Sequence, residues 1–333
     1  MRPKVLVTGA AGFIGSHLVD RLLSAGHSVI GLDRRSPRAN LLARLNLADA
    51  MAHSRFHWVE ADLASTTLGP LLDGVDCVFH LAAIPGVRRS WGNGLPGYVR
   101  ANVLATGALL AGCERAGVRR LVYASSSSVY GPALTASRET HPTLPLSPYG
   151  VTKLAGEQLC LAHALRRESR LSVVALRYFT VYGPRQRPDM AISRMLAAAL
   201  TAAPYTVFGD GRQRREFTYV SDVVDATLAA RTAEATATTV NVGGGASVPV
   251  AEVLRLVEEV TGNPVLRRPG VEQAGDTATT AADLSAARLL LGYQPRVDLP
   301  TGLTLQAEWL RGLPASALGL FIPSPTSAEE VPA

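Results

Sequence analysis

The N-terminal stretch constrains the fold more than any other part of the chain. Residues 4–8 (KVLVT) have the β-branched pattern of a buried strand, and residues 9–15 (GAAGFIG) lead from them into an amphipathic helix predicted over 16–25. Glycines allow the backbone to approach a phosphate closely, and the N-terminus of a helix attracts negative charge. The order of strand, glycine loop and helix therefore predicts a pyrophosphate site at the first turn of an α/β sheet.

A second predicted strand, over residues 28–32, ends at an acidic side chain. Asp33 stands where a carboxylate accepts hydrogen bonds from the adenosine ribose and repels a 2′-phosphate. The two motifs together predict a dinucleotide site that takes NAD in preference to NADP, although Arg34 and Arg35 follow directly. A glycine turn that serves packing alone is the alternative interpretation.

Strands and helices continue to alternate along the chain. Further strands are predicted over residues 56–60, 76–81, 120–125, 171–178 and 239–242, and helices over 97–116, 149–168, 190–200, 249–261 and 284–291. Alternation of this kind is typical of a doubly wound parallel sheet, the Rossmann architecture, whose ligands bind at the carboxyl ends of the strands.

The rhythm changes after Tyr178, which predicts a second domain. We expect residues 1–178 to form the NAD-binding Rossmann domain, completed by about 217–243. Residues 179–216 and 244–312 should form a smaller, mixed α/β domain for the substrate. Residues 313–333, rich in proline, serine and alanine, are predicted to be a flexible tail.

The catalytic residues are predicted to lie on a helix that begins with Ser147 and Pro148. Tyr149 and Lys153 lie four residues apart and therefore share one face of this helix. A phenol titrates near pH ~10, and a neighbouring ammonium stabilises its ionised form. Lys153 and Lys4 are the two lysines of the chain, and arginine cannot replace a compact ammonium in this role. The pair predicts a tyrosine base, with a surface pair of no function as the alternative.

Composition excludes several other classes of function. The net charge of +6 comes from scattered arginines without a basic run, which argues against nucleic-acid binding and suits anionic small substrates. No apolar run is long enough for a membrane span, and the chain enters its first strand without a signal peptide. Three separated cysteines suit a reducing compartment, so a cytoplasmic location is expected. The seven scattered histidines predict no metal site.

Residues 4–310 resemble the extended short-chain dehydrogenase/reductase family, in particular its nucleotide-sugar epimerases and dehydratases. The resemblance rests on GAAGFIG, Asp33, Leu81-Ala82-Ala83, residues 125–131 (SSSSVYG), Tyr149 with Lys153, residues 177–188 (RYFTVYGPRQRP) and Arg215-Glu216-Phe217. It implies that Tyr149 is the general base and that Ser126 binds the reacting oxygen. It also implies that Lys153 holds the nicotinamide ribose and lowers the pKa of Tyr149.

The same resemblance implies two sets of binding residues. The cofactor set consists of Gly9, Gly12, Phe13, Ile14, Gly15, Asp33, Arg34, Asp62, Leu63, Leu81, Ala82, Ala83, Tyr149, Lys153 and Tyr178. The substrate set consists of Pro85, Arg88, Ser126, Ser127, Ser128, Tyr149, Thr180, Arg185, Phe208, Arg215 and Asp276. The chain departs from the family pattern at Glu216, where aspartate is more frequent, and at residues 273–275 (QAG), which replace an arginine-bearing segment.

Two serines distinguish between reactions within the family. The 4,6-dehydratases carry an Asp-Glu pair, and the glucuronate decarboxylases a Glu, where this chain has Ser127 and Ser128. Serine cannot shuttle protons near neutral pH. The resemblance therefore implies 4-epimerisation, in which hydride leaves C4 for NAD⁺, the 4-keto sugar turns, and hydride returns to its other face.

The sugar is expected to be UDP-glucuronate, converted to UDP-galacturonate. Residues 85–88 (PGVR) and 179–182 (FTVY) are similar to UDP-glucuronate 4-epimerases, and hydroxyls at 126–128 and 180 could bind a C5 carboxylate. Alternatively, Ser127 and Ser128 only satisfy backbone groups in a turn. UDP-glucose 4-epimerisation is the second candidate, then a dTDP-glucose 4,6-dehydratase-like activity. A non-catalytic NAD-binding regulator is the alternative from a different class.

A homodimer is also expected. The helices over 97–116 and 149–168 carry more apolar residues than one sheet face needs, namely Leu104, Leu109, Leu154, Leu159 and Leu161. Relatives that resemble this chain dimerise through the same two helices.

Overall fold

A parallel sheet forms the centre of the larger domain. The computed structural model describes residues 3–133, 135–270 and 278–322. Its seven strands lie in the order β10-β6-β5-β4-β1-β2-β3 and pair in parallel throughout, as the Rossmann prediction requires. Their bounds are β1 Lys4–Thr8, β2 Ser28–Asp33, β3 Phe56–Glu60, β4 Cys77–His80, β5 Arg120–Ser126, β6 Ser172–Tyr178 and β10 Ala237–Val242.

Helices cover both faces of this sheet because its strands are apolar on both sides. On β1, Val5 and Val7 pack with helices α1 and α9, whereas Leu6 between them packs with α4, α6 and α7. These helices are α1 Phe13–Ser24, α4 Gly69–Leu72, α6 Ala105–Ala116, α7 Pro148–Leu165 and α9 Val220–Ala229. The short helices α2 Leu41–Asn46 and α3 Ala48–Met51 precede β3, and α11 Ser285–Leu291 contacts β10.

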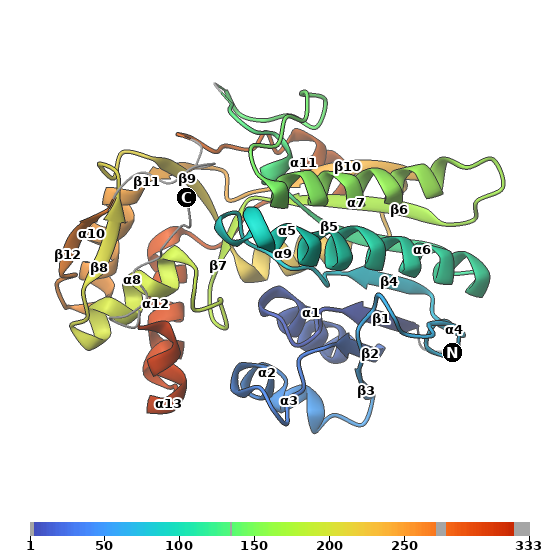
Figure 1. Ribbon diagram of the computed structural model, residues 1–333, viewed down its shortest axis with the longest axis horizontal. Helices are drawn as coiled ribbons and strands as arrows, with labels where there is room; N and C mark the ends of the chain where they lie inside the picture. The colour runs from blue at the N-terminus through green and yellow to red at the C-terminus, as the bar shows by residue number, and fades with distance from the viewer. Residues whose placement is uncertain (1–2, 134, 271–277, 323–333) are drawn as a thin grey trace.

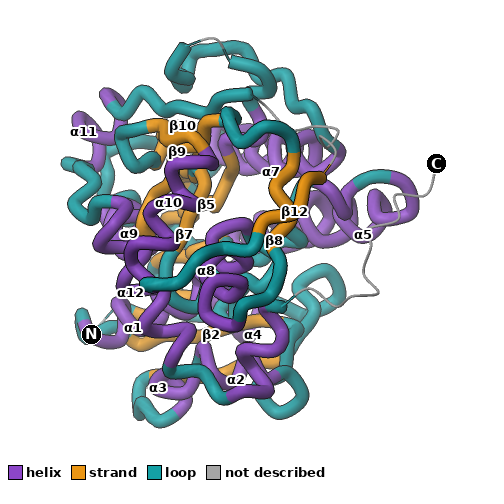
Figure 2. Tube along the Cα trace, turned by 90° about the vertical axis from the view of Figure 1, so that its left-hand side faces the viewer, coloured by secondary structure: helices purple, strands orange, loops and turns teal. Residues whose placement is uncertain are grey.

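The smaller domain lies beside the carboxyl ends of the strands, on the left of Figure 1. It contains a three-stranded sheet, β11-β9-β7, and a two-stranded sheet, β12-β8. These strands are β7 Thr180–Tyr182, β8 Tyr205–Phe208, β9 Arg214–Tyr219, β11 Ser247–Pro249 and β12 Arg267–Gly270. Helices α8 Ala191–Thr201, α10 Val250–Thr261 and α12 Leu299–Arg311 pack together in Figure 2 and share one apolar cluster with the α1 face of the large sheet.

The predicted helix over 97–116 is interrupted. It consists of α5 Leu95–Val99, a π-helical turn at Arg100–Leu104 and then α6. The π turn places Asn102 in the interior, where its side chain binds the backbone N–H and C=O of Ile84 at 2.7 and 3.0 Å and the Thr152 hydroxyl at 3.0 Å. The irregular turn therefore joins α7 to the loop after β4, and such turns often occur near functional sites.

The C-terminal region differs from the prediction at two places. Helix α12 was not predicted, although its sequence start signals are present: Asp298 accepts a hydrogen bond from the Thr301 N–H, and Pro300 lies in the first turn. Part of the predicted tail is structured, because α13 Ala315–Leu318 and the short helix Gly319–Phe321 follow α12, and the Phe321 ring packs edge-on against Trp309. Residues 323–333 lie outside the described residues.

A buried ion pair joins α7 to the central strands. Glu157 is fully buried and accepts hydrogen bonds from Arg177 Nη2 at 2.6 Å, Arg177 Nε at 3.0 Å and Ser125 Oγ at 2.5 Å. The guanidinium also lies over the Tyr130 ring, 4.8 Å from its centroid. Because both charges are out of water, each depends on the other for compensation.

We therefore predict that Glu157→Ala lowers the free energy of unfolding by about 3–5 kcal/mol, because it leaves the Arg177 guanidinium buried without its counter-charge. The measurement is urea denaturation of the variant beside the wild type. Asp225→Ala is the control, since it breaks an exposed pair with Arg21 and should cost less than about 1 kcal/mol. Equal losses from the two variants would contradict the prediction, and replacing both partners (Glu157→Leu with Arg177→Met) should recover most of the loss.

Candidate active site

The carboxyl ends of the central strands open into a cavity of about 470 Å³. Its walls come from the loops after β1, β2, β3, β4, β5 and β6, from α7, and from the segment that leads into the smaller domain. All fifteen residues of the predicted cofactor set line this cavity. The structure therefore brings the separate sequence motifs to one place, as the switch-point rule for open α/β sheets predicts.

The glycine loop fits the backbone approach that a pyrophosphate needs. Gly9 has a φ of +72°, and a Cβ atom there would lie 2.8 Å from the Ala82 nitrogen. A Cβ at Gly15 would collide with the carbonyl oxygen of Gly9. Gly12 precedes α1 without a side-chain cap, so the first N–H groups of this helix remain available to an anion.

Asp33 lies at the end of the cavity where the adenosine of the cofactor would bind, and its carboxylate already has hydrogen-bond partners within the protein. Its carboxylate accepts hydrogen bonds from the Ala11 N–H at 3.2 Å and the Arg35 N–H at 3.0 Å, and it pairs with the Arg35 guanidinium at 3.1 Å. Arg34 and Arg35 line the same end of the cavity. A ribose that binds Asp33 must therefore share the carboxylate with Arg35. This loop and its acid fit NAD, whose ribose hydroxyls are donors.

The catalytic candidates converge at the other end. Ser147 caps α7 by accepting a hydrogen bond from the Gly150 N–H at 3.1 Å, and Pro148 fills the first helical position, as predicted. This start places Tyr149 at the cavity, near enough to Ser126 for the serine hydroxyl to lower the pKa of the phenol. Ser126 ends β5 and also accepts a hydrogen bond from the Ser128 N–H at 3.1 Å, which fixes the serine turn.

Burial dominates the ionisation of both α7 residues. It raises the pKa of Tyr149, while the hydrogen bond from Ser126 and the positive charge of Arg187 act in the opposite direction. Burial lowers the pKa of Lys153 to about 8, opposed by Cys160 and Glu157. The Lys153 ammonium lies 4.3 Å from the centroid of the Tyr123 ring. Arg187 therefore adds a positive charge that favours the Tyr149 phenolate, and the contribution expected of Lys153 stays a prediction.

The predicted substrate residues divide into two groups. Pro85, Ser126, Ser127, Ser128, Tyr149 and Thr180 line the cavity. Arg88 instead lies over the Phe208 ring, 4.3 Å from its centroid, and neither residue is among those that line the cavity. Arg185 also lies away from the lining and pairs with Asp20 of α1 at 2.6 Å.

Arg215 and Asp276 are the last two predicted substrate residues, and the structure describes only the first of them. Arg215 Nη1 donates to the Arg214 carbonyl at 2.9 Å, and Asp276 lies outside the described residues. Glu216, the departure from the family pattern, is buried and accepts hydrogen bonds from the N–H groups of Gly245 and Ala282. Its longer side chain therefore has a structural role, since it holds β9 to the loops on either side.

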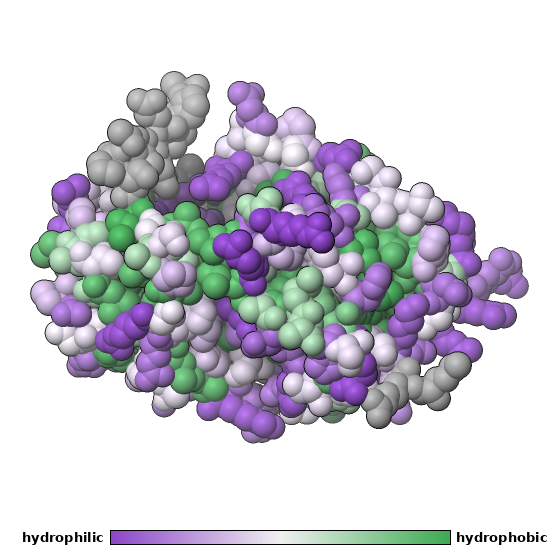
Figure 3. Space-filling view, turned by 90° about the horizontal axis from the view of Figure 1, so that it is seen from below, coloured by the Kyte–Doolittle hydropathy of each residue, from purple (hydrophilic) through white to green (hydrophobic). Residues whose placement is uncertain are grey.

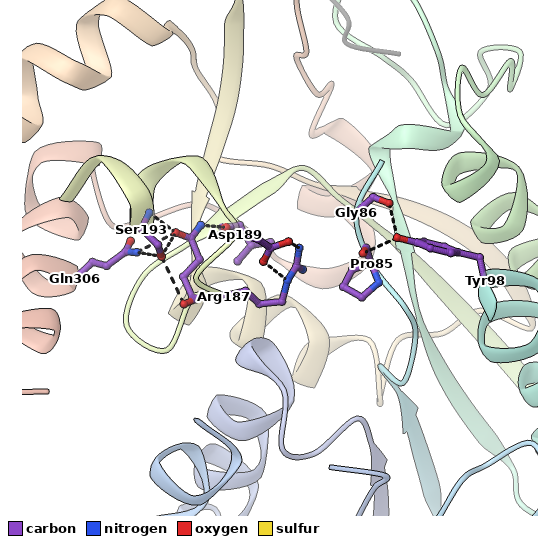
Figure 4. A network of polar contacts seen from close by, with 9 residues as sticks. Pro85, Gly86, Tyr98, Arg187, Asp189, Ser193 and Gln306 are labelled. Atoms are coloured by element: carbon purple, nitrogen blue, oxygen red, sulfur yellow. Dashed lines mark hydrogen bonds and ion pairs between the residues drawn. The ribbon is translucent and has the colours of Figure 1, made fainter. Parts of the chain in front are cut away.

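Sequence reasoning missed two residues near the catalytic end. Arg187 lines the cavity, and Asp189 holds its guanidinium by two hydrogen bonds of 2.9 and 3.0 Å (Figure 4). The Tyr98 ring lies edge-on to Tyr149, and its hydroxyl donates to the carbonyls of Pro85 and Gly86 at 3.1 and 2.9 Å. The sequence shows arginines at both 185 and 187 but does not indicate which of them faces the cavity.

No helix of the described residues is long and apolar enough to cross a membrane. On the face shown in Figure 3, apolar residues gather in patches with hydrophilic residues between them. The described residues also contain no group of three or more histidine, cysteine or acidic side chains placed to hold a metal ion.

Three comparisons with known proteins are consistent with this geometry. The chain is 44% identical over 313 residues to an uncharacterized UDP-glucose epimerase, YtcB, of Bacillus subtilis, covering 93% of this chain and 98% of the relative. The structure is similar to MoeE5 in complex with UDP-glucose and NAD, with a TM-score of 0.85, 46% identity, and coverage of 92% and 98%. It is also similar to UDP-glucuronic acid 4-epimerase from Bacillus cereus in complex with UDP-glucuronic acid and NAD, with a TM-score of 0.88, 41% identity, and coverage of 92% and 99%.

A family model matches most of the larger domain and its continuation. It covers residues 5–243, from the first strand of the central sheet to the residue after its last strand in sequence, β10. The match, the parallel sheet and the convergence of the predicted motifs on one cavity agree with one another. The chain belongs to the NAD dependent epimerase/dehydratase family.

Proposed function

We propose that the protein catalyses the NAD-dependent 4-epimerisation of a UDP-sugar, and that this sugar is glucuronate, converted reversibly to galacturonate. The observation that carries the proposal is the composition of the cavity around Tyr149. Hydroxyls and a guanidinium line that end, whereas among the described lining residues the carboxylates are those of Asp33, at the end of β2, and Asp62, in the loop after β3. A dehydratase needs a proton-transferring acid and base beside the sugar, and this end of the cavity lacks them.

The residues of the chain supply the proton chemistry. Tyr149, as phenolate, takes the proton of the sugar 4-hydroxyl, and Ser126 holds the reacting oxygen in place. When bound, NAD supplies the acceptor and donor of hydride and a positive charge that favours the phenolate. After the ketone has turned, Tyr149 returns the proton to the oxygen. Because burial raises the pKa of Tyr149, the opposing effects of Ser126 and Arg187 contribute directly to its competence as a base.

Three hydroxyls support the choice of a uronate. Among the described residues, the side chains of Ser127, Ser128 and Thr180 line the cavity without a hydrogen bond to protein, since Ser126 already satisfies the serine turn. Arg187 adds a positive charge at the same end. Charge-assisted hydrogen bonds to a carboxylate contribute about 1.5–3 kcal/mol each, more than contacts to a neutral ring hydroxyl.

Holding the carboxylate also has a chemical purpose. Oxidation of glucuronate at C4 gives a β-keto acid, which loses CO₂ when the bond to the carboxylate aligns with the π system of the ketone. An epimerase must prevent that alignment while the ring turns. Donors at two different places, the turn after β5 and the first residue of β7, can fix the carboxylate from two sides.

UDP-glucose is the second candidate substrate. The Bacillus subtilis relative carries that sugar in its name, and MoeE5 was solved with it. The dTDP-glucose 4,6-dehydratase-like alternative is disfavoured by Ser127 and Ser128, and a non-catalytic regulator by the arrangement of Tyr149, Lys153 and Ser126. A cytoplasmic location remains part of the proposal.

We also propose a homodimer formed by α6 and α7, which lie side by side at the front of Figure 1. The structure corrects the predicted surface: Leu109 is fully buried against the sheet, and Leu154, Leu159 and Leu161 are partly buried in apolar clusters. Leu104 is exposed as predicted, and Val151 and Leu165 are exposed as well. Gly107, where an added Cβ would meet nothing within 4 Å, allows a second helix to approach closely.

The first prediction concerns the base. Tyr149→Phe should lower kcat at least ~10³-fold, because it removes the proton acceptor without changing the ring. NAD released by denaturing the purified variant should equal that from wild type. Tyr293→Phe is the matched control, since its hydroxyl bonds the Gly243 carbonyl far from the cavity. A Tyr149→Phe variant that keeps a tenth of the wild-type rate would show that another group is the base. Lys153→Arg should also be inactive.

The second prediction concerns the substrate. Proton NMR of the products should show UDP-galacturonate from UDP-glucuronate, at a higher kcat/KM than for UDP-glucose, with little UDP-pentose. Thr180→Ala should lower kcat/KM for UDP-glucuronate by about tenfold or more relative to UDP-glucose, whereas Thr180→Ser, which keeps the hydroxyl, should not. The proposal of a carboxylate site fails if wild-type protein epimerises UDP-glucose faster.

The third prediction concerns assembly. Light scattering at micromolar concentration should give twice the chain mass, and Leu104→Asp should give a monomer because it places a charge in the apolar contact. Leu289→Asp, at an exposed leucine of α11, should remain dimeric. A monomeric wild-type protein would remove the proposed dimer.

A further inference from the structure

The loop between β7 and α8 adopts a conformation that its sequence does not favour. Arg185 has a φ of +65°, and Ala202, which ends α8, is the other described non-glycine residue with a positive φ. Side chains rarely adopt this region because the Cβ approaches the backbone. The surrounding structure must therefore hold the loop, residues 183–189, in place.

One anchor of the loop lies inside the smaller domain. Gln186 is buried, donates to the Val181 carbonyl at 2.8 Å, and accepts from the Ser193 N–H at 3.0 Å and from Gln306 at 2.9 Å. Gln306, from α12, also accepts the Gly183 N–H at 2.9 Å. Figure 4 shows Ser193 and Gln306 at this end of the network. These bonds fix the loop to its own domain.

A second anchor lies on α1, the helix that follows the glycine loop. Asp20 accepts a hydrogen bond from Arg185 Nη1 at 2.6 Å, and His17 Nε2 bonds the Pro184 carbonyl at 2.8 Å. Because a carbonyl only accepts, Nε2 carries the proton. Burial lowers the pKa of His17 to about 4, with Arg185 acting in the same direction, so the ring is neutral near pH 7. The His17 ring also packs edge-on against Phe13, which lines the cavity.

Arg187 follows these two anchors in the sequence and lines the cavity. Asp189 fixes its guanidinium by two hydrogen bonds, and its charge acts on Tyr149. Neither Asp20, His17 nor Arg185 lines the cavity. They can therefore affect a bound sugar through the loop without touching the sugar.

We propose that Asp20 is a positioning residue for the sugar end of the site, acting through its ion pair with Arg185 and assisted by His17. The pair holds residues 183–189 against α1, so that the helix at the dinucleotide site also sets the place of Arg187 opposite Tyr149. Arg185 thus has a linking role rather than the substrate contact that the sequence suggested. The kinetic part of the test rests on the proposed epimerase function.

The test is a charge-swap cycle. Asp20→Lys and Arg185→Asp each place like charges against one another, and the double variant restores an attractive pair of one long and one short side chain. Aspartate also tolerates a positive φ better than arginine. The control is Arg21→Asp on the same helix, which sets like charges against Asp225 of α9 without touching the loop.

Each single variant should lower kcat/KM for the nucleotide sugar by about tenfold or more, mainly through KM, because a displaced positioning group acts on the bound sugar. The double variant should recover most of this loss, and Arg21→Asp should match wild type. NAD content and the Kd for UDP should stay unchanged in every variant, which separates positioning from general damage. Single variants equal to the control, or a double variant no better than the singles, would overturn the proposal.

Hydrogen–deuterium exchange provides a readout that needs no turnover. Peptides covering residues 183–190 should exchange faster in each single variant, return to the wild-type rate in the double variant, and remain unchanged in Arg21→Asp. If wild-type protein epimerises no UDP-sugar but shows this pattern, the proposed function fails and the link between α1 and the loop stands. Active wild-type protein with unchanged exchange in the single variants would overturn the link alone.

Discussion

We expect the site to depend on one buried ammonium that must stay charged. Lys153 is 3% exposed, and burial lowers its pKa to about 8. Two neighbours compensate for the lost water: the face of Tyr123, 4.3 Å from Nζ, and Glu157, one helical turn further along α7. Glu157 is itself held by Arg177 of β6 and Ser125 of β5. The fold of the central strands and the charge state of the site are therefore set by the same network.

The part of the cavity beside Tyr149 has no carboxylate among its described lining residues, and this limits the reactions it can support. Among the described residues of the cavity wall, acids occur at the end of β2 and in the loop after β3, while the turn after β5 and the start of β7 present hydroxyls beside Tyr149. A tyrosine base with hydroxyls and a guanidinium around it can move one proton to and from the same oxygen but has no carboxylate partner for removing water. The small difference between serine and an acidic side chain at positions 127 and 128 thus favours epimerisation.

Both domains contribute residues to the cavity, so both set the positions of the cofactor and sugar sites relative to one another. The larger domain supplies the glycine loop, Asp33, Tyr149 and Lys153, and the chain leaving β6 supplies Thr180 and Arg187 from the side of the smaller domain. Helix α1 contacts both parts, since its first residues line the cavity and His17 and Asp20 bind the loop after β7. The proposed role of Asp20 would make the spacing between cofactor and sugar depend on residues that contact neither of them.

The sequence by itself determined the parallel sheet, the glycine loop, the strand-end Asp33 and the Tyr149 helix, because each depends on local signals: periodicity, glycine, and a serine-proline helix start. It could not determine which loop arginine reaches the cavity, that Lys153 lies on Tyr123, or that Asn102 turns inward at a π-helical turn. These features depend on partners distant in the chain, such as Asp20 for Arg185 and Ile84 for Asn102. Tertiary packing decided them, because the direction of a side chain is set by which distant group compensates its charge or hydrogen bonds.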